Sequence, residues 1–153
     1  CIAPQIWQQA RMEALDKEFR GNYRILGTDL DKSSLEIARS NAQKAGVANY
    51  IEFYAADATR VEPPASQGVL VTNPPYGERM LEQRTAQQLY RQLGRHLRGY
   101  DGWRMSIISS EPEFEYYFGQ KADKKRKLYN GRLQCNVYFY GTKRLRSAGG
   151  HKA

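Results

Sequence analysis

The residues of this 153-residue chain with the clearest chemical potential are four consecutive ones, Asn73, Pro74, Pro75 and Tyr76. The side-chain oxygen of Asn73 and the backbone carbonyl of Pro74 are two acceptors that can point at the two hydrogens of one amino group. Proline has a fixed φ and no N–H, so the proline pair holds this turn rigid. Tyr76 adds a flat face on which a base extruded from a nucleic-acid helix can stack.

This arrangement favours methyl transfer to the exocyclic amine of a base. The lone pair of an aromatic amine is delocalised into the ring, and two acceptors on its hydrogens make the nitrogen more tetrahedral and more nucleophilic. A methyl carbon carried on a sulfonium already has a good leaving group, so positioning rather than a general base supplies most of the rate. The same four residues also fit an ordinary turn or a proline-rich ligand peptide.

Two acidic residues follow predicted strands and could bind a nucleotide-like cofactor. Asp29 could accept hydrogen bonds from both hydroxyls of a ribose, although it could instead cap a helix, and Asp31 competes for the same role. Asp57 could accept a hydrogen bond from an adenine amino group while a neighbouring backbone N–H donates to the ring. Its alternative role is that of a turn residue.

The elements that position these residues follow from hydrophobic periodicity and turn signals. Helices are expected over residues 6–20, from a cap at Asp31 or Ser33 to residue 45, over 85–97 and over 112–118. The aliphatic strand 69–72 leads into Asn73 and is expected to be buried on both faces of a parallel sheet. Further strands are expected over residues 23–28, 50–54, 103–109, 127–129 and 133–140, the last two joined by an Asn130-Gly131 turn.

Alternating strands and helices predict an α/β fold with an open, mostly parallel sheet and a C-terminal antiparallel hairpin. Ligands bind such sheets at the carboxyl ends of the strands. Asp29, Asp57 and Asn73 all follow such ends, which is why they are candidates for one site.

The charge of the chain is concentrated near its C-terminus. Residues 119–153 hold 10 Lys and Arg and one Asp, whereas residues 1–118 hold 14 Lys and Arg and 15 Asp and Glu. A basic segment fits a nucleic-acid partner through phosphate neutralisation, although a solvated tail has the same composition. Tyr129, Tyr138 and Tyr140 could stack on bases or could be core residues.

Several function classes have little support in the sequence. Cys1 and Cys135 are far apart and belong to no zinc-like cluster, so buried or incidental thiols are expected. His96 and His151 are isolated, and no metal site is predicted. No apolar run is long enough for a membrane span, and we expect a cytoplasmic protein with no membrane partner.

Residues 71–79 (Val-Thr-Asn-Pro-Pro-Tyr-Gly-Glu-Arg), 27–31 and 121–131 resemble the THUMP-associated 23S rRNA guanine-N2 methyltransferases. The resemblance covers nearly the whole chain. It implies a Rossmann-like class I methyltransferase fold with S-adenosyl-L-methionine as cofactor, and 23S rRNA or its precursor ribosomal particle as partner. It places Asp29 at the cofactor ribose, Asp57 at its adenine and residues 73–76 at the target amine. Leu30, Ala58 and Asn73 are also expected to contact the cofactor.

Members of that family also carry an N-terminal THUMP module and a first strand that ends in a Gly-rich cofactor loop. Neither is found in residues 1–153, which therefore resemble part of a methyltransferase catalytic domain. Basic residues of the last block and its surroundings are expected to contact rRNA phosphates: Lys121, Lys124, Lys125, Arg126, Lys127 and Arg132, followed by residues 143–146.

Two other functions remain open at the level of sequence. The four-residue run is shared with DNA adenine-N6 methyltransferases, because the chemistry at the amine is the same. A non-catalytic RNA-binding fragment would keep the fold and the basic segment without transferring a methyl group.

Overall fold

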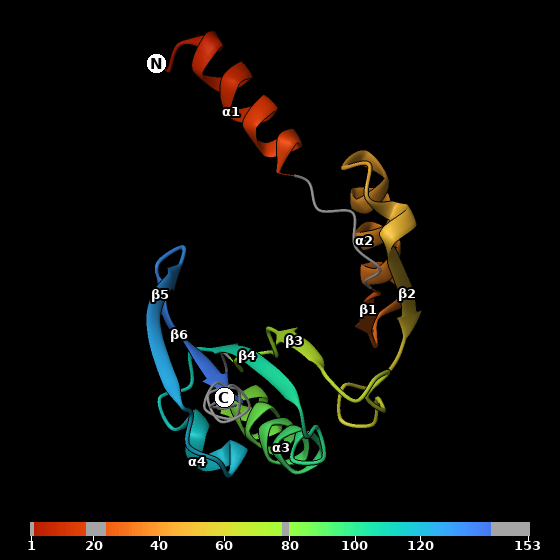
Figure 1. Ribbon diagram of the computed structural model, residues 1–153. Helices are drawn as coiled ribbons and strands as arrows, with labels where there is room; N and C mark the ends of the chain where they lie inside the picture. The colour runs from red at the N-terminus through yellow and green to blue at the C-terminus, as the bar shows by residue number, and fades with distance from the viewer. Residues whose placement is uncertain (1, 18–23, 78–79, 142–153) are drawn as a thin grey trace, which may run out of the picture. The chain divides into compact units, whose positions relative to one another are not determined.

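The computed structural model describes residues 2–17, 24–77 and 80–141, and it divides the chain into two compact units, Cys1–Ala55 and Ala56–Ala153 (Figure 1). The first unit contains helix α1 (Pro4–Asp16), strand β1 (Ile25–Asp29), helix α2 (Lys32–Lys44), a 3-10 helix (Ala48–Tyr50) and strand β2 (Ile51–Ala55). Strands β1 and β2 are parallel, so that Asp29 lies opposite Ala55. Helix α2 packs on both strands and buries Leu35 and Ala42.

The helices of the first unit begin where local signals place them. Helix α1 begins at Pro4, earlier than predicted, because the missing N–H of proline costs nothing in the first turn of a helix. The predicted end of this helix at residue 20 lies outside the described residues. Helix α2 is capped by Asp31, whose carboxylate accepts a hydrogen bond from the backbone N–H of Ser33 at 2.9 Å. The prediction of a cap at Asp31 or Ser33 is therefore confirmed, with Asp31 as the cap.

The second unit contains one mixed sheet. Its elements are strand β3 (Gly68–Thr72), helix α3 (Met80–Leu97), strand β4 (Trp103–Ser109), helix α4 (Phe114–Phe118), strand β5 (Lys124–Asn130) and strand β6 (Leu133–Tyr140). The strand order is β3-β4-β6-β5, with β3 and β4 parallel and both pairings of β6 antiparallel. The predicted combination of parallel strands with a C-terminal antiparallel hairpin is confirmed.

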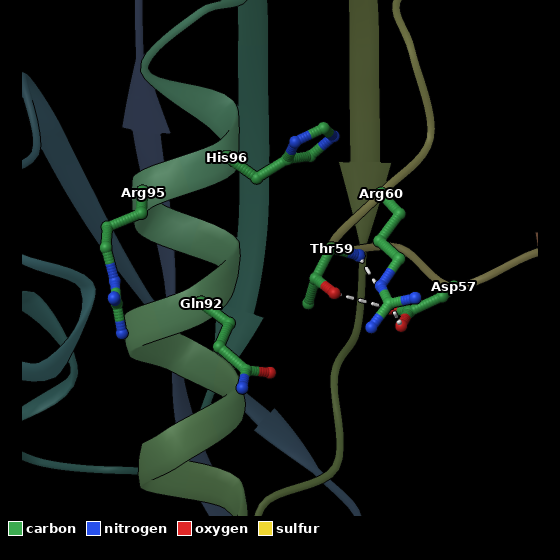
Figure 2. Close-up of a pocket in the computed structure, with 6 residues that line it drawn as sticks. All are labelled: Asp57, Thr59, Arg60, Gln92, Arg95 and His96. Carbon is green, nitrogen blue, oxygen red and sulfur yellow. Dashed lines mark hydrogen bonds and ion pairs between the residues drawn. The ribbon is translucent and has the colours of Figure 1, made fainter.

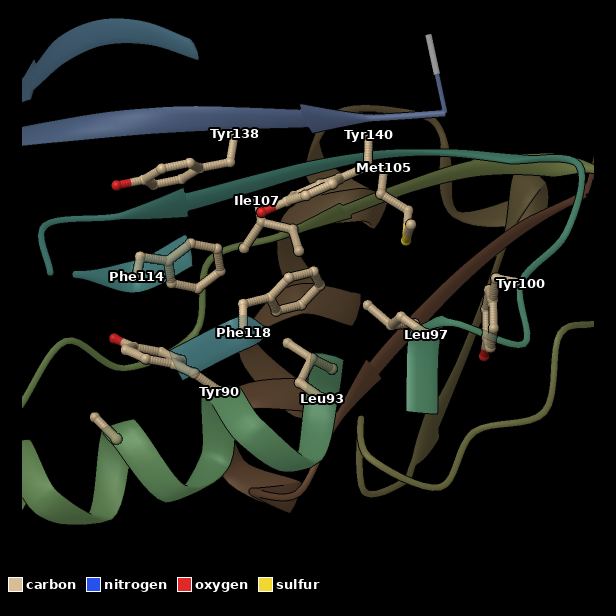
Figure 3. Packing of buried hydrophobic residues seen from close by; sticks show 11 residues of the cluster. Tyr90, Leu93, Leu97, Tyr100, Met105, Ile107, Phe114, Phe118, Tyr138 and Tyr140 are labelled. Atoms are coloured by element: carbon tan, nitrogen blue, oxygen red, sulfur yellow. The ribbon is translucent and has the colours of Figure 1, made fainter. Parts of the chain in front are cut away.

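The core of this unit lies between the sheet and the two helices α3 and α4 (Figure 3). Ile107 of β4 and Tyr140 of β6 are fully buried on the face of the sheet that meets these helices. Phe118 of α4 packs against Tyr140 with the ring centroids 5.0 Å apart and the rings tilted by 36°. The aromatic side chains of β6 therefore hold the helices against the sheet, and Tyr138 and Tyr140, at 2% and 0% exposure, are core residues.

The prediction that strand 69–72 is buried on both faces is wrong in this structure. Val69 and Val71 are 61% and 71% exposed, whereas Leu70, between them, packs against the core. Successive side chains of a strand point to opposite faces, and the helices of this unit cover only the face that carries Leu70. An aliphatic sequence shows that a strand can be buried on both faces, but the arrangement of the helices decides whether it is.

The C-terminal hairpin differs from its prediction by one residue at the turn and three at its start. Asn130 pairs with Leu133, so the loop residues are Gly131 and Arg132 rather than Asn130 and Gly131. Gly131 has a φ of 62°, and glycine is the residue that accepts a positive φ at the first position of a two-residue hairpin loop. Strand β5 begins at Lys124, because the pairing with β6 extends back to Phe139.

Candidate active site

The Asn73-Pro74-Pro75-Tyr76 loop follows β3 directly, at the carboxyl end of that strand. Pro74 is buried, Asn73 is exposed and Tyr76 is partly buried. The Tyr76 hydroxyl donates a hydrogen bond of 2.5 Å to the side-chain oxygen of Asn73. An amide oxygen has two lone pairs, so Asn73 keeps acceptor capacity for a target amine while Tyr76 fixes its direction.

Two further contacts define the environment of this loop. Burial, followed by interaction with Cys135 of β6, raises the pKa of Tyr76, so its hydroxyl stays protonated as a donor at neutral pH. Gly77 ends the loop with a φ of 70°, and a Cβ there would lie 2.5 Å from the Cα of Gln83 in α3. Only glycine allows the chain to turn this close to the helix.

At the end of β1, hydrogen bonds show which of the two carboxylates, Asp29 or Asp31, caps helix α2. Asp31 accepts from the backbone and hydroxyl of Ser33 and from the hydroxyl of Ser34, and these contacts, led by the Ser33 hydroxyl, lower the pKa of Asp31. Asp29 uses one oxygen to accept from the Asp31 N–H at 2.9 Å. Its other oxygen accepts no hydrogen bond from a described residue, which leaves it suited to the hydroxyls of a ribose. Leu30 is 72% exposed beside it.

Asp57 forms the turn that follows β2. Its carboxylate accepts from the hydroxyl and the backbone N–H of Thr59 at 2.7 and 2.9 Å, and Arg60 lies 3.6 Å away. The Thr59 hydroxyl is the largest of the effects that lower the pKa of Asp57. Ala58 is exposed in the same turn. The carboxylate is therefore ionised and held in place, as an adenine acceptor must be, although it also serves the turn.

Asp57 also lines an open hollow of about 470 Å³ between the turn and helix α3 (Figure 2). His96 fixes the nearby chain through a 2.7 Å hydrogen bond between its Nε2 and the carbonyl of Val61. The hollow is lined by Asp57, Thr59, Arg60, Gln92, Arg95 and His96.

The basic residues of the hairpin fall into two groups. Lys125 forms a 2.7 Å ion pair with Glu115 of α4, and its Nζ lies 5.9 Å from the centre of the Tyr138 ring. The charge of Lys125 is therefore neutralised by a partner within the fold. The others are exposed, as Lys125 also is, but form no ion pair with a described residue and can meet a phosphate: Lys121, Lys124, Arg126, Lys127 and Arg132. Tyr129 is 65% exposed and remains a candidate for stacking. Residues 143–146 lie outside the described part of the chain.

The remaining expectations concern thiols, metals and membranes. Cys135 is a fully buried free thiol, as expected, and Cys1 and His151 lie outside the described residues. Within the described ranges, no three His, Cys, Asp or Glu side chains gather as metal ligands. Of the helices described, none combines the length and the apolar character needed to cross a membrane.

The structure adds three residues that the sequence did not single out. Tyr90 of α3 donates a 2.7 Å hydrogen bond to the carbonyl of Pro75, and Ser109 and Glu111 lie behind it. Ser109 is the last residue of β4, so the rule that selected Asp29 and Asn73 at strand ends could have found it. Tyr90 lies in the apolar stripe of a helix, where nothing local separates it from an ordinary core tyrosine.

The chain matches a known protein family over most of its length. Residues 2–138 match the family described as RMKL-like, methyltransferase domain. The chain belongs to this family. The family resemblance stated from the sequence is thereby confirmed.

Relatives of this methyltransferase domain include two enzymes named ribosomal RNA large subunit methyltransferase K/L. The one from Shewanella amazonensis is 39% identical over 140 residues, which are 88% of this chain and 20% of that protein. The one from Legionella pneumophila strain Lens is 39% identical over 134 residues, 87% of this chain and 19% of that protein. The chain thus spans about a fifth of the length of these relatives.

Two solved structures share the fold. A possible methylase from Clostridium difficile 630 aligns with a TM-score of 0.81 and 45% identity over 91% of this chain and 37% of its own. The methyltransferase candidate SMU.472, which is complexed with SAH, aligns with a TM-score of 0.79 and 34% identity over 90% and 37% of the two chains. The predicted Rossmann-like methyltransferase fold is confirmed.

Proposed function

We propose that this methyltransferase domain transfers a methyl group from S-adenosyl-L-methionine to the exocyclic N2 amine of a guanosine in 23S rRNA. The observation that carries the proposal is the loop of residues 73–76, in which the exposed Asn73 oxygen is aimed by the Tyr76 hydroxyl. The names of the relatives, which act on the RNA of the large ribosomal subunit, support rRNA as the substrate.

The residues of the chain divide the work of binding and orientation. Asp29, with Leu30 beside it, holds the ribose of the cofactor through its remaining carboxylate oxygen. Asp57 accepts from the adenine amino group, beside Ala58. The bound cofactor supplies an electrophilic methyl carbon with a sulfonium leaving group. The SAH held by SMU.472 supports this choice of cofactor, because SAH is what remains after methyl transfer.

The target base is held by the loop itself. Asn73 and the carbonyl of Pro74 accept hydrogen bonds from the two amine hydrogens and direct the lone pair at the methyl carbon. As the N–C bond forms, the C–S bond breaks and SAH leaves, and one of the two amine protons is then lost to solvent. Tyr76 stacks on the base once it is extruded from its helix. The exposed basic residues of the hairpin, led by Lys124, Arg126 and Lys127, bind RNA phosphates and add affinity that does not depend on sequence. A substrate of this kind, 23S rRNA or its precursor particle, implies that the protein acts in the cytoplasm.

The test is to replace Asn73 with Ala in the complete protein. Methyl transfer is expected to fall by at least about a hundredfold, because the loss of one oriented hydrogen-bonding group at a reacting centre costs about that much. The dissociation constant of the cofactor is expected to change by less than about threefold, since Asn73→Ala removes a group needed in the transition state. Asn41→Ala, on the exposed side of α2, is the control and should change neither quantity.

The substrate is identified by mass spectrometry of nucleosides from 23S rRNA and genomic DNA of cells lacking the gene. A loss of N2-methylguanosine from the rRNA supports the proposal. A full set of N2-methylguanosine together with a loss of N6-methyladenine from DNA would establish the adenine alternative instead. Absence of cofactor binding by the complete protein would favour the non-catalytic RNA-binding alternative.

A further inference from the structure

The Asn73-Pro74-Pro75-Tyr76 loop has fewer backbone N–H donors with which to form stabilising hydrogen bonds than other segments of four residues. Pro74 and Pro75 have no N–H, so two consecutive donors are missing from the segment. Among the described residues, no backbone-to-backbone hydrogen bond outside helices and strands involves residues 73–77. The carbonyl oxygens are the remaining backbone groups through which the loop can be fixed.

One such donor comes from the core. Tyr90, on the buried face of α3, has no exposed surface, and its hydroxyl donates to the Pro75 carbonyl at 2.7 Å. Its ring is held edge-on against Phe114 with centroids 5.0 Å apart (Figure 3). Burial raises the pKa of Tyr90, so the hydroxyl keeps its proton at neutral pH.

The Tyr90 hydroxyl is itself oriented by a second buried hydroxyl. The backbone N–H of Glu111 donates to Ser109 Oγ at 3.1 Å, and the Ser109 hydroxyl donates to Tyr90 Oη at 3.4 Å. Ser109 is fully buried and Glu111 is 6% exposed. Each group thus accepts from the one behind it and donates to the one ahead, and hydrogen bonds arranged in this way strengthen one another.

The start of this relay is also fixed. The Glu111 carboxylate accepts from the backbone N–H of Glu113 at 3.2 Å and from the side chain of Gln87 at 3.4 Å. The relay therefore joins the carboxyl end of β4, helix α3 and the loop after β3. A displacement of any of these elements would therefore move the hydrogen-bond donor of the Pro75 carbonyl.

We infer that Tyr90 is a positioning residue for the methyl-transfer site, acting through its hydrogen bond to the Pro75 carbonyl. The Pro74 carbonyl and Asn73 lie within two residues of the anchored group, and the fixed φ of Pro75 transmits the anchor to them. Tyr90 holds the loop from the core, while the Tyr76 hydroxyl holds Asn73 from the exposed side. The inference rests on the proposed function for its catalytic consequence only, because the anchor itself is a property of the loop.

The test compares Tyr90→Phe with Tyr140→Phe in the complete protein. Both variants keep a fully buried ring and remove one hydroxyl that donates to a backbone carbonyl, that of Pro75 at 2.7 Å or that of Gln120 at 3.3 Å. Tyr90→Phe is expected to lower kcat by about 10- to 100-fold, as small misplacements of reacting groups do. The KM for RNA and the Kd for cofactor are expected to stay within about threefold of the wild-type values. The reason is that the loop keeps the groups that bind these ligands and loses only the alignment of the acceptors at the target amine. Tyr140→Phe should leave kcat unchanged.

Amide hydrogen exchange gives a second measurement that needs no substrate. In a peptide covering residues 71–77, the amides that can be protected are those of Val71 and Thr72, which pair with β4. Their exchange is expected to be at least about tenfold faster in Tyr90→Phe than in the wild-type protein, because a loop without its anchor lets the end of β3 open more easily. Tyr140→Phe should match the wild type in this peptide.

Equal exchange in both variants, or an equal fall of kcat in both, would overturn the anchor. A wild-type protein that transfers no methyl group to rRNA would refute the proposed function, while the exchange of residues 71–77 would still decide whether Tyr90 anchors the loop.

Discussion

Helix α3 lies close against the backbone at the end of α4 at Gly94. A Cβ added to Gly94 would lie 1.9 Å from the carbonyl oxygen of Phe118 and 2.8 Å from its carbonyl carbon. Carbon and oxygen atoms that are not bonded normally stay about 3.3 Å apart. In Gly94→Ala the two helices must therefore separate by about 1 Å or more, because a backbone carbonyl cannot rotate away as a side chain can.

The cost can be worked out from two opposing effects. Alanine is favoured over glycine within a helix by about 1 kcal/mol. Overpacking a well-filled core costs about 1 to 3 kcal/mol, and contact with a backbone atom places this case at the upper end of that range. The free energy of unfolding is thus expected to fall by about 2 kcal/mol, which for a chain of this size lowers the Tm by about 4 to 8 °C.

Urea and thermal denaturation of Gly94→Ala measure this loss directly. The control is Gly99→Ala just after α3, where a Cβ would meet only the carbonyl oxygen of His96 at an ordinary 3.6 Å. The control is expected to stay within about 0.5 kcal/mol of the wild type. Gly94→Ala should also lower methyl transfer, because Tyr90 lies one turn earlier on the same helix. A Gly94→Ala protein as stable as the wild type would refute this account of the packing.

Two further predictions concern the ion pair between Glu115 and Lys125. Burial alone would raise the pKa of Glu115, but hydrogen bonds from Lys125 and from the Ala122 N–H outweigh it and hold the pKa below its ordinary value. A lowered carboxyl pKa stabilises the fold above the unfolded value of about 4.3 and ceases to do so as the pH falls through the folded value. The stability difference between wild type and Glu115→Gln, measured as urea midpoints, should therefore be largest near neutral pH and shrink on acidification; a difference independent of pH would contradict the pairing. In RNA binding, Lys127→Ala should reduce the slope of log Kd against log salt by about one, and Lys125→Ala by clearly less, because Lys125 is already neutralised by Glu115; equal slopes for the two variants would argue against this division.

Elements with strong local signals were predictable from the sequence. Strand β4 has the predicted bounds, because its alternating apolar residues and flanking turns are contained within the strand itself. The Asp31 cap of α2 was predictable for the same reason, since a cap is an interaction between residues two apart. The hairpin was expected, but its turn lies one residue later because the ladder with β6 sets the register.

Contacts between residues far apart in the chain could not be predicted in this way. Nothing in the sequence near Val69 and Val71 indicates that the helices of their unit would cover only the opposite face of β3. The pairing of Lys125 with Glu115 depends on how α4 lies against β5, so a basic run alone could not separate Lys125 from Lys127.

The sequence by itself was enough to predict the chemistry proposed for the site, because the donors and acceptors of residues 73–76 are properties of four consecutive residues. It also determined the family, since those residues occur with their surrounding motifs. Only the tertiary structure decided how the loop is fixed, because Tyr90 lies 15 residues beyond Pro75 and reaches it through the packing of α3. A reacting group stays aligned only if neighbouring side chains hold it by hydrogen bonds and packing. Those side chains are brought together by the fold rather than by the local sequence.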